Sequence, residues 1–247
     1  AAISNTTGSN GKATAVAAGT ATITAASGLI SGSTIMAVTS APYITAAVLS
    51  LSGGSNPLGW LQQVQVYTDS LSYIPITSAT VTVNGSPLSY TAANQSYYGN
   101  VIIAAGATVN LSITVGGAVY TASGTQYTTF PGVTAPASGS TWQAVHANTI
   151  SWTAGAPTSG ATYVVGLINS TGNFIYPGKN PVNVLTSSAS YTVPANSLTA
   201  GNYELLVGIG TQGIGGENTG GIAIPNTAGG SGLWIGGITA FVPITVK

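Results

Sequence analysis

Charged side chains are almost missing from this sequence. Its 247 residues include three Lys or Arg and three Asp or Glu, so 2% of the chain is charged against about 25% of an average soluble domain. Size scaling gives a folded chain of this length a surface on the order of 10,000 Å², or roughly one charge per ~1,700 Å². The net charge of zero removes repulsion between copies and leaves no field that would attract nucleic acid or anionic lipid. We expect self-association and no nucleic-acid partner.

Cysteine and long apolar runs are also absent. Without cysteine no disulfide can staple the fold, and cysteine usage gives no information on the redox compartment. Gly, Ser and Thr interrupt every hydrophobic stretch, so none approaches the ~20 residues of a membrane-spanning helix. The first residues, Ala1-Ala2-Ile3-Ser4, are typical of a processed mature end or of the first ordered residues of a longer chain. We expect a secreted protein, extracellular or on the cell surface, without a membrane span.

Titratable side chains are too few and too dispersed to predict a catalytic site. Asp69 and His146 fall in different predicted modules, and no Ser stands in a Gly-x-Ser-x-Gly elbow near them. Glu204 and Glu217 share a module, but nothing in their spacing pairs them for glycoside hydrolysis. One His, no Cys and no alternating Asp give no metal ligand set. The sequence predicts no enzyme, no metal and no cofactor.

One segment matches the consensus sequence of a nucleotide-binding motif. Gly208-Ile209-Gly210-Thr211-Gln212-Gly213 reads Gly-x-Gly-x-x-Gly and follows a strand-like run. A dinucleotide site also needs a helix that begins at this loop and an acid about 20 residues later, whereas more glycines follow here. We interpret the segment as a flexible or packed surface loop.

The sequence is rich in residue patterns that are typical of β-strands. Short β-branched and aromatic runs, bounded by Gly, Pro, Asn and Ser, alternate between apolar residues and hydroxyls or amides, as in 20–25, 64–67, 79–83 and 109–115. Asn84-Gly85 supplies the positive φ angles of a hairpin turn, and 104–107 forms a second turn signal. The pattern predicts an all-β protein of tandem immunoglobulin-like or fibronectin III-like antiparallel sandwiches.

The N-terminal segment carries a more specific motif. Residues 11–25 read Gly-x-Ala-x-Ala-x-x-x-Gly-x-Ala-x-Ile-x-Ala and precede Ser31-Gly32-Ser33-Thr34. Over about 40 residues this resembles the second half of a bacterial immunoglobulin-like group 2 domain. The resemblance implies two strands paired around a tight turn within this run, followed by a last strand. The family's opening strands have no counterpart, so residues 1–41 are expected to form a partial β-domain whose missing strands come from a longer chain, a neighbouring module or another subunit.

Two further modules are expected after it. Residues 42–131 are predicted to form an immunoglobulin-like sandwich. Residues 132–247 resemble a fibronectin III-like sandwich through Trp152 on a strand pattern, a Tyr163-centred strand and Gly201-Asn202-Tyr203 before a late strand. A Gly-rich insertion, 208–237, departs from that pattern. A fold of this kind is silent about function.

The resulting hypothesis is a structural subunit of a self-assembling extracellular filament or surface appendage, a homopolymer formed by β-strand addition between subunits. The predicted assembly contacts are Thr20, Thr22, Ile23, Thr34, Ile35 and Val38, with Trp234 and Ile235 of the Gly-rich segment as a second contact.

The alternative is a cell-surface adhesin or carbohydrate-binding fragment of a larger secreted protein, with glycans or other surface components as partners. Sugar-stacking candidates are Trp60, Tyr97, Tyr98, Trp142 and Trp234, whereas Trp152 is expected in the core. Candidate glycosylation sites are Asn5, Asn94, Asn110 and Asn169.

Overall fold

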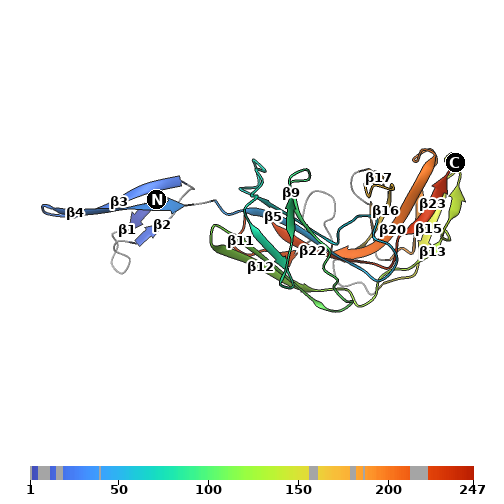
Figure 1. The fold of residues 1–247 in the computed structure, drawn as a ribbon, viewed down its shortest axis with the longest axis horizontal. Helices are drawn as coiled ribbons and strands as arrows, with labels where there is room; N and C mark the ends of the chain where they lie inside the picture. The colour runs from blue at the N-terminus through green and yellow to red at the C-terminus, as the bar shows by residue number, and fades with distance from the viewer. Residues whose placement is uncertain are drawn as a thin grey trace. The chain divides into compact units, whose positions relative to one another are not determined.

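The computed structural model describes residues 2–4, 12–14, 19–38, 40–155, 161–178, 182–185, 187–211 and 222–247. Every regular element in these ranges is a β-strand, which confirms the predicted all-β class. The chain divides into two compact units, Ala1–Pro42 and Tyr43–Lys247. The two units are described separately below (Figure 1).

Four strands belong to the first unit: β1 (Ala2–Ser4), β2 (Lys12–Thr14), β3 (Gly19–Ser27) and β4 (Ile30–Val38). The strands of the second unit up to residue 152 are β5 (Tyr43–Leu51), β6 (Gln62–Tyr67), β7 (Thr80–Val83), β8 (Ser86–Pro87), β9 (Ser89–Thr91), β10 (Ser96–Gly99), β11 (Thr108–Val115), β12 (Ala118–Thr125), β13 (Val133–Ala135), β14 (Ser140–Trp142) and β15 (Asn148–Trp152). They are followed by β16 (Ala161–Ile168), β17 (Phe174–Tyr176), β18 (Val182–Leu185), β19 (Ser190–Val193), β20 (Gly201–Thr211), β21 (Ile222–Ala223), β22 (Gly232–Ile238) and β23 (Val242–Val246).

The first unit consists of two small antiparallel sheets. β1 pairs with β2, and β3 pairs with β4. The two-residue turn between β3 and β4 has Gly28 at φ +61°, which suits the first central position of a type II′ hairpin turn. The resemblance to the bacterial family implied that residues 12–14 would pair with the run that begins at Gly19. They pair with β1 instead, because the tight turn lies after β3 and gives β3 to the following strand.

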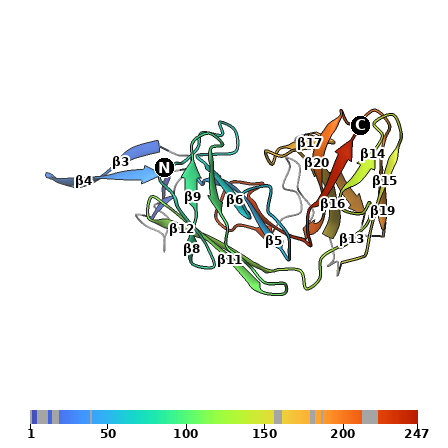
Figure 2. The same cartoon turned by 45° about the vertical axis from the view of Figure 1, so that its right-hand side comes forward.

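The second unit is built from one large sheet and two smaller ones. The large sheet runs β14-β23-β20-β22-β5-β6-β10-β9, with β16 on the other side of β20. The smaller sheets are β12-β11-β7-β8 and β13-β15-β19. Figure 2 shows β11 and β12 along one part of the large sheet, and β13, β15 and β19 beside the C-terminal strand.

Two apolar cores lie between these layers. In the first, Val64 and Val66 of the large sheet pack with Val109, Leu111 and Ile113 of β11. The second core lies between the β13-β15-β19 sheet and strands β16, β20 and β23, and its members include Ile150, Trp152, Tyr163, Leu205 and Val207. The alternation read in the sequence places these residues on one face of each strand, as a two-layer sandwich requires. Trp152 is buried, as predicted.

The large sheet crosses the expected module boundary at 131/132. β22 pairs in parallel with β5 over seven residues, and its Leu233 and Ile235 belong to the first core. A third apolar cluster, which includes Leu49, Leu206 and Trp234, joins the β5 and β20 parts of the sheet on another face. The C-terminal part of the chain therefore completes the sheet that β5 begins.

The interpretation of the glycine motif as a surface loop is wrong for residues 208–211, which are the buried end of β20 apart from the half-buried Thr211. The reason is the indole ring of Trp234. A Cβ atom at Gly210 or at Gly236 would overlap that ring, so glycine here makes room for a buried tryptophan between strands. Residues 232–238 of the predicted insertion form buried β22, and 212–221 lie outside the described residues.

Candidate functional site

The hairpin β3–β4 is the candidate functional element. Its two strands pair over nine positions, from Gly19 opposite Val38 to Ser27 opposite Ile30. Within the described parts of the chain, neither strand pairs with any other. Two rows of backbone N–H and C=O groups therefore face outward from the hairpin, as on the edge strands of a sheet.

The two faces of the hairpin differ in chemistry. Residues directly opposite each other share a face, so Thr22 and Ile35 lie on one face while Ile23 and Thr34 lie on the other. The first face is rich in hydroxyls and exposed, and it comprises Thr20, Thr22, Thr24, Ser31, Ser33 and Ile35. The second face carries the half-buried Ala21, Ile23 and Met36.

Large apolar side chains are exposed on this hairpin. Leu29 at the turn is fully exposed, Ile30 is 80% exposed and Ile35 is 74% exposed. An isolated two-stranded hairpin is at best marginally stable in water, because it has no second layer to cover its apolar face. The hairpin has the chemistry of an incomplete sheet.

The predicted assembly contacts therefore divide into two groups. Thr20, Thr22, Thr34 and Ile35 are exposed on the hairpin, and Ile23 is half-buried there. Val38 ends β4; its side chain is outside the described part. The second predicted contact is corrected, because Trp234 and Ile235 of β22 are buried in the cores of the second unit and offer no surface to another subunit.

Sequence reasoning missed Leu29 and Ile30, since it assigned no role to either residue. The signal that would have found them is an apolar pair placed next to Gly28 at a tight turn. It also did not identify β12 as a strand with one side that pairs with no other described strand. The signal there is Gly116-Gly117 followed by eight uncharged residues without proline.

The titratable residues that the structure describes lie on different elements. Asp69 lies in the loop after β6, His146 is exposed in the loop between β14 and β15, and Glu204 lies in β20. The described ranges contain no cluster of three or more His, Cys, Asp or Glu residues that could hold a metal ion. Glu217 and Lys179 lie outside those ranges.

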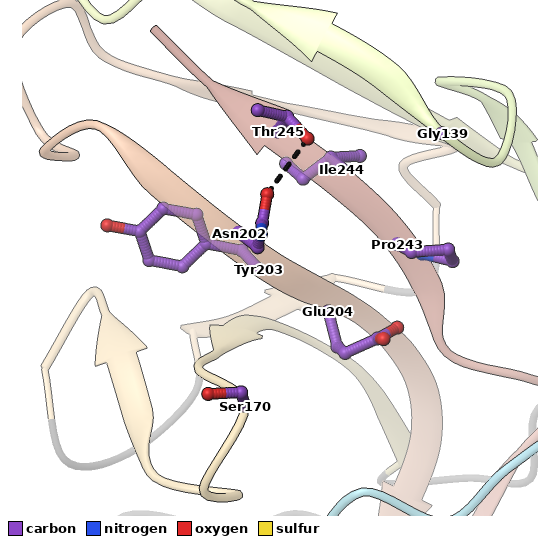
Figure 3. Close-up of a pocket in the computed structure, with 8 residues that line it drawn as sticks. All are labelled: Gly139, Ser170, Asn202, Tyr203, Glu204, Pro243, Ile244 and Thr245. Carbon is purple, nitrogen blue, oxygen red and sulfur yellow. Dashed lines mark hydrogen bonds between the residues drawn. The ribbon is translucent and has the colours of Figure 1, made fainter.

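Glu204 lines a surface depression of about 130 Å³ between β20, β23 and the loop after β16. The Thr245 hydroxyl donates to Asn202 Oδ1 at 3.0 Å and bridges β20 and β23 at this depression (Figure 3). Burial raises the pKa of the Glu204 carboxyl. The other described lining residues are Gly139, Ser170, Tyr203, Pro243 and Ile244, so Glu204 is the one carboxylate among the described residues that line the depression.

Asp69 has a structural role in its own loop. Its carboxylate accepts hydrogen bonds from the Ser72 hydroxyl at 2.6 Å, from the Ser72 and Leu71 amides at 2.7 and 2.8 Å, and from the Thr68 hydroxyl at 3.2 Å. These bonds, led by the one from the Ser72 hydroxyl, lower the pKa of Asp69 to about 2. The carboxylate is used to shape the β6–β7 loop.

The candidate aromatic strip is largely internal. Tyr97, Trp142 and Trp234 are buried, which leaves Trp60 and Tyr98 half-buried with ring centroids 5.8 Å apart. Gln63 donates to the Tyr98 hydroxyl at 3.0 Å and fixes that ring. One aromatic pair remains of the predicted sugar-stacking set.

Three of the four candidate glycosylation sites are described. Asn94 lies exposed in the turn before β10, and Asn110 is exposed on β11. Asn169 is half-buried, and its Oδ1 accepts from the Thr171 hydroxyl and from two backbone amides. Asn5 lies outside the described residues.

Comparisons with known proteins do not show a family. No protein-family model and no curated protein matches the chain. Among solved structures, the fibronectin(III)-like modules of CbhA from Clostridium thermocellum are similar to 83% of this chain and 92% of that chain, at 14% identity and a TM-score of 0.25. A structural similarity at this TM-score does not support a fold assignment. The assignment of β-sandwiches therefore rests on the strand pairing described above. The group 2 resemblance of residues 1–40 stays a prediction. Among the described residues, no helix is long and apolar enough to cross a membrane.

Proposed function

We propose that this protein is a structural subunit of an extracellular filament or surface appendage, and that copies join by β-strand addition through the hairpin β3–β4. One observation carries the proposal. The hairpin has unpaired outer edges within the described residues and exposes Ile30 and Ile35. A strand added by another copy would pair with the free backbone groups of the hairpin edge. The surface of that copy would also cover the exposed apolar side chains.

The composition supports assembly over dispersion. With three positive and three negative side chains, two copies repel each other little at neutral pH. Strand addition uses backbone hydrogen bonds and therefore needs no charged side chains. A contact between the hairpin of one copy and a different surface of the next is head-to-tail, and it generates a filament when the rotation between copies does not close a ring.

The test is negative-stain electron microscopy of the full chain and of a variant that lacks residues 1–40. We expect regular filaments from the full chain and dispersed particles from the deletion variant. The deletion leaves the strands of the second unit in place, and circular dichroism should still report a folded β protein. Normal filaments from the deletion variant would refute the proposal, as would a full chain that stays dispersed at all concentrations.

A matched pair of substitutions separates the hairpin from added charge in general. Ile30→Asp places a carboxylate beside the hairpin turn, whereas Val145→Asp places one on an exposed loop of the second unit. We expect Ile30→Asp to raise the protein concentration needed for filaments at least tenfold, because a charge must be desolvated at the contact. Val145→Asp should leave that concentration within about twofold of the parent chain.

A surface fragment that binds glycans is the second candidate, because the Trp60–Tyr98 pair is half-exposed. Sugar rings stack on such aromatic faces. Calorimetry with soluble polysaccharides on the parent chain and on Trp60→Ala tests this reading. Binding that the substitution abolishes, together with a dispersed parent chain, would favour it over the filament.

A further inference from the structure

The second unit has one long edge strand that nothing in the described structure covers. β12 pairs with β11 over all eight residues on one side and has no strand partner on the other side within the described ranges. The other strands there that have a wholly unpaired side are far shorter: β8 and β21 have two residues, β9, β13, β14 and β17 have three, and β18 and β19 have four. Among the described strands of the second unit, only β12 offers eight consecutive residues with an unpaired side to a strand as long as β4.

β12 also lacks the features that protect natural edge strands. Exposed edges are usually interrupted by charged residues, proline or a bulge. The sequence Ala118–Thr125 contains no charge and no proline, and its register with β11 runs without a bulge. Val119 is 60% exposed on this strand. An edge of this kind is a ready site for strand pairing.

The inner face of β12 is held firmly. Ala122 belongs to the first core, and Gly124 lies against the side chains of Ile222 and Ile235. The edge is therefore presented by a packed sandwich, and little order has to be gained when a strand joins it.

We infer that the outer edge of β12 receives strand β4 of a second copy. This inference rests on the proposed function and names its acceptor surface. An antiparallel register that sets Ile35 opposite Val119 also sets Ser33 opposite Thr121 and Ser31 opposite Ser123. The aliphatic pair and the two hydroxyl pairs are the cross-strand combinations that stabilise antiparallel sheets.

The same register also pairs residues on the other face of the two strands. Ile30 comes to lie beside Gly124, and Gly32 beside Ala122. The exposed Ile30 thereby comes to lie at the edge of the first core, where Gly124 lies against Ile222 and Ile235. Pairing in this register uses residues 30–36 of β4 and 118–124 of β12, so nearly the whole free edge is used.

The absence of native cysteine allows a direct test by disulfide cross-linking. The full chain carries Ile35→Cys with Val119→Cys, or Ser33→Cys with Thr121→Cys, and is oxidised under assembly conditions. Opposite residues in an antiparallel sheet lie about 4.5–5.5 Å apart at Cβ, within reach of a disulfide or of a short thiol cross-linker. We expect a ladder of covalent multimers on a denaturing gel, removed by reductant.

The matched control is Ile35→Cys with Thr192→Cys, since Thr192 is exposed on the short edge strand β19. It should give no ladder. A ladder from the Thr192 pair in place of the β12 pairs would overturn the inference, and so would a cross-link confined to the monomer, which would place the hairpin on its own β12. A covalent dimer from Val119→Cys alone would overturn it as well, because two β12 edges would then pair with each other.

An edge-blocking variant keeps the inference falsifiable without cysteine chemistry. Val119→Lys adds a solvated charge to the β12 edge, and Ile74→Lys adds one at an exposed loop position. We expect Val119→Lys to raise the concentration needed for filaments at least tenfold and Ile74→Lys to leave it within twofold. If deletion of residues 1–40 abolishes filaments while Val119→Lys does not, the acceptor assignment fails and the proposed function stands. If filaments survive the deletion, both fail.

Discussion

The hairpins β3–β4 and β11–β12 have similar sequence patterns and different surroundings. Both are antiparallel, uncharged and alternate between apolar and hydroxyl residues. In β11, Leu111 and Ile113 are fully buried because the large sheet covers that face. In β3–β4, Ile35 remains 74% exposed. The alternation specifies the strand and its apolar face, whereas burial depends on a second layer that the pattern does not specify.

The energetic consequence is large. Burial of one Leu or Ile side chain contributes about 1.5–3 kcal/mol, and β11 gains this contribution several times over. The hairpin β3–β4 has no comparable source in the described residues, so its order depends on what it contacts. The second unit is expected to fold by its own cores, and the hairpin to gain its stability from a partner.

The largest expected effect separates the two hairpins directly. Ile113→Ala should lower the free energy of unfolding by about 2–5 kcal/mol, because it leaves a cavity in the first core. Ile35→Ala should change it by less than about 0.5 kcal/mol in the dispersed chain, because its side chain is exposed. Urea denaturation below the concentration for assembly measures both. A large loss from Ile35→Ala would mean that the hairpin already packs within its own chain.

A smaller effect is expected from the glycines around Trp234. Gly210→Ala places a methyl group into the buried indole ring and should cost about 1–3 kcal/mol through overpacking. Gly229→Ala is the matched control, since a Cβ there meets nothing within 4 Å and its φ is not positive. The shift in the urea midpoint measures both variants. Equal stability for the two variants would show that the Trp234 ring can move aside.

Much of the fold was predictable from local pattern. The alternating runs 64–67, 79–83 and 109–115 coincide with β6, β7 and β11, and Asn84 and Gly85 have the expected positive φ values of 48° and 79°. These features are local, because alternation and turn geometry depend on neighbouring residues. The predicted all-β class follows from them.

The sheet order was not predictable, because it depends on contacts that are distant in sequence. The glycines of 208–211 were interpreted as a loop and those of 236–237 as part of a Gly-rich insertion, yet Gly210, Gly236 and Gly237 make room for Trp234 and Phe130 between strands. The parallel pairing of β22 with β5 joins segments almost 190 residues apart. No local pattern encodes that pairing, and the same limit hid Trp234 and Ile235 inside the cores. The two strands of the hairpin were predictable from their alternation, whereas their pairing with each other, the exposed apolar turn and the free edge of β12 required the structure.

The smallest expected effect concerns an exposed apolar segment inside the second unit. Leu71 is 90% exposed and Ile74 is 58% exposed, but their loop is held by the hydrogen bonds that the Asp69 carboxylate accepts from Leu71 and Ser72. The pKa of Asp69 is lowered to about 2, so this group favours the folded loop at every pH above the ordinary pKa near 4. That contribution is lost as the pH falls from about 4 to about 2.

Carbon-13 NMR of the Asp69 carboxyl should give a titration midpoint near 2, and the amide proton shifts of Leu71 and Ser72 should follow the same midpoint. Ser72→Ala removes the hydroxyl that contributes most to the lowered pKa, so its midpoint should move up toward 4. Asp69→Asn should abolish the titration of both amides. The hairpin β3–β4 contains no carboxylate, so its amide shifts should stay constant over this range. A midpoint near 4 in the parent chain would show that the loop is not held by these bonds, and the contrast with the hairpin turn would then disappear.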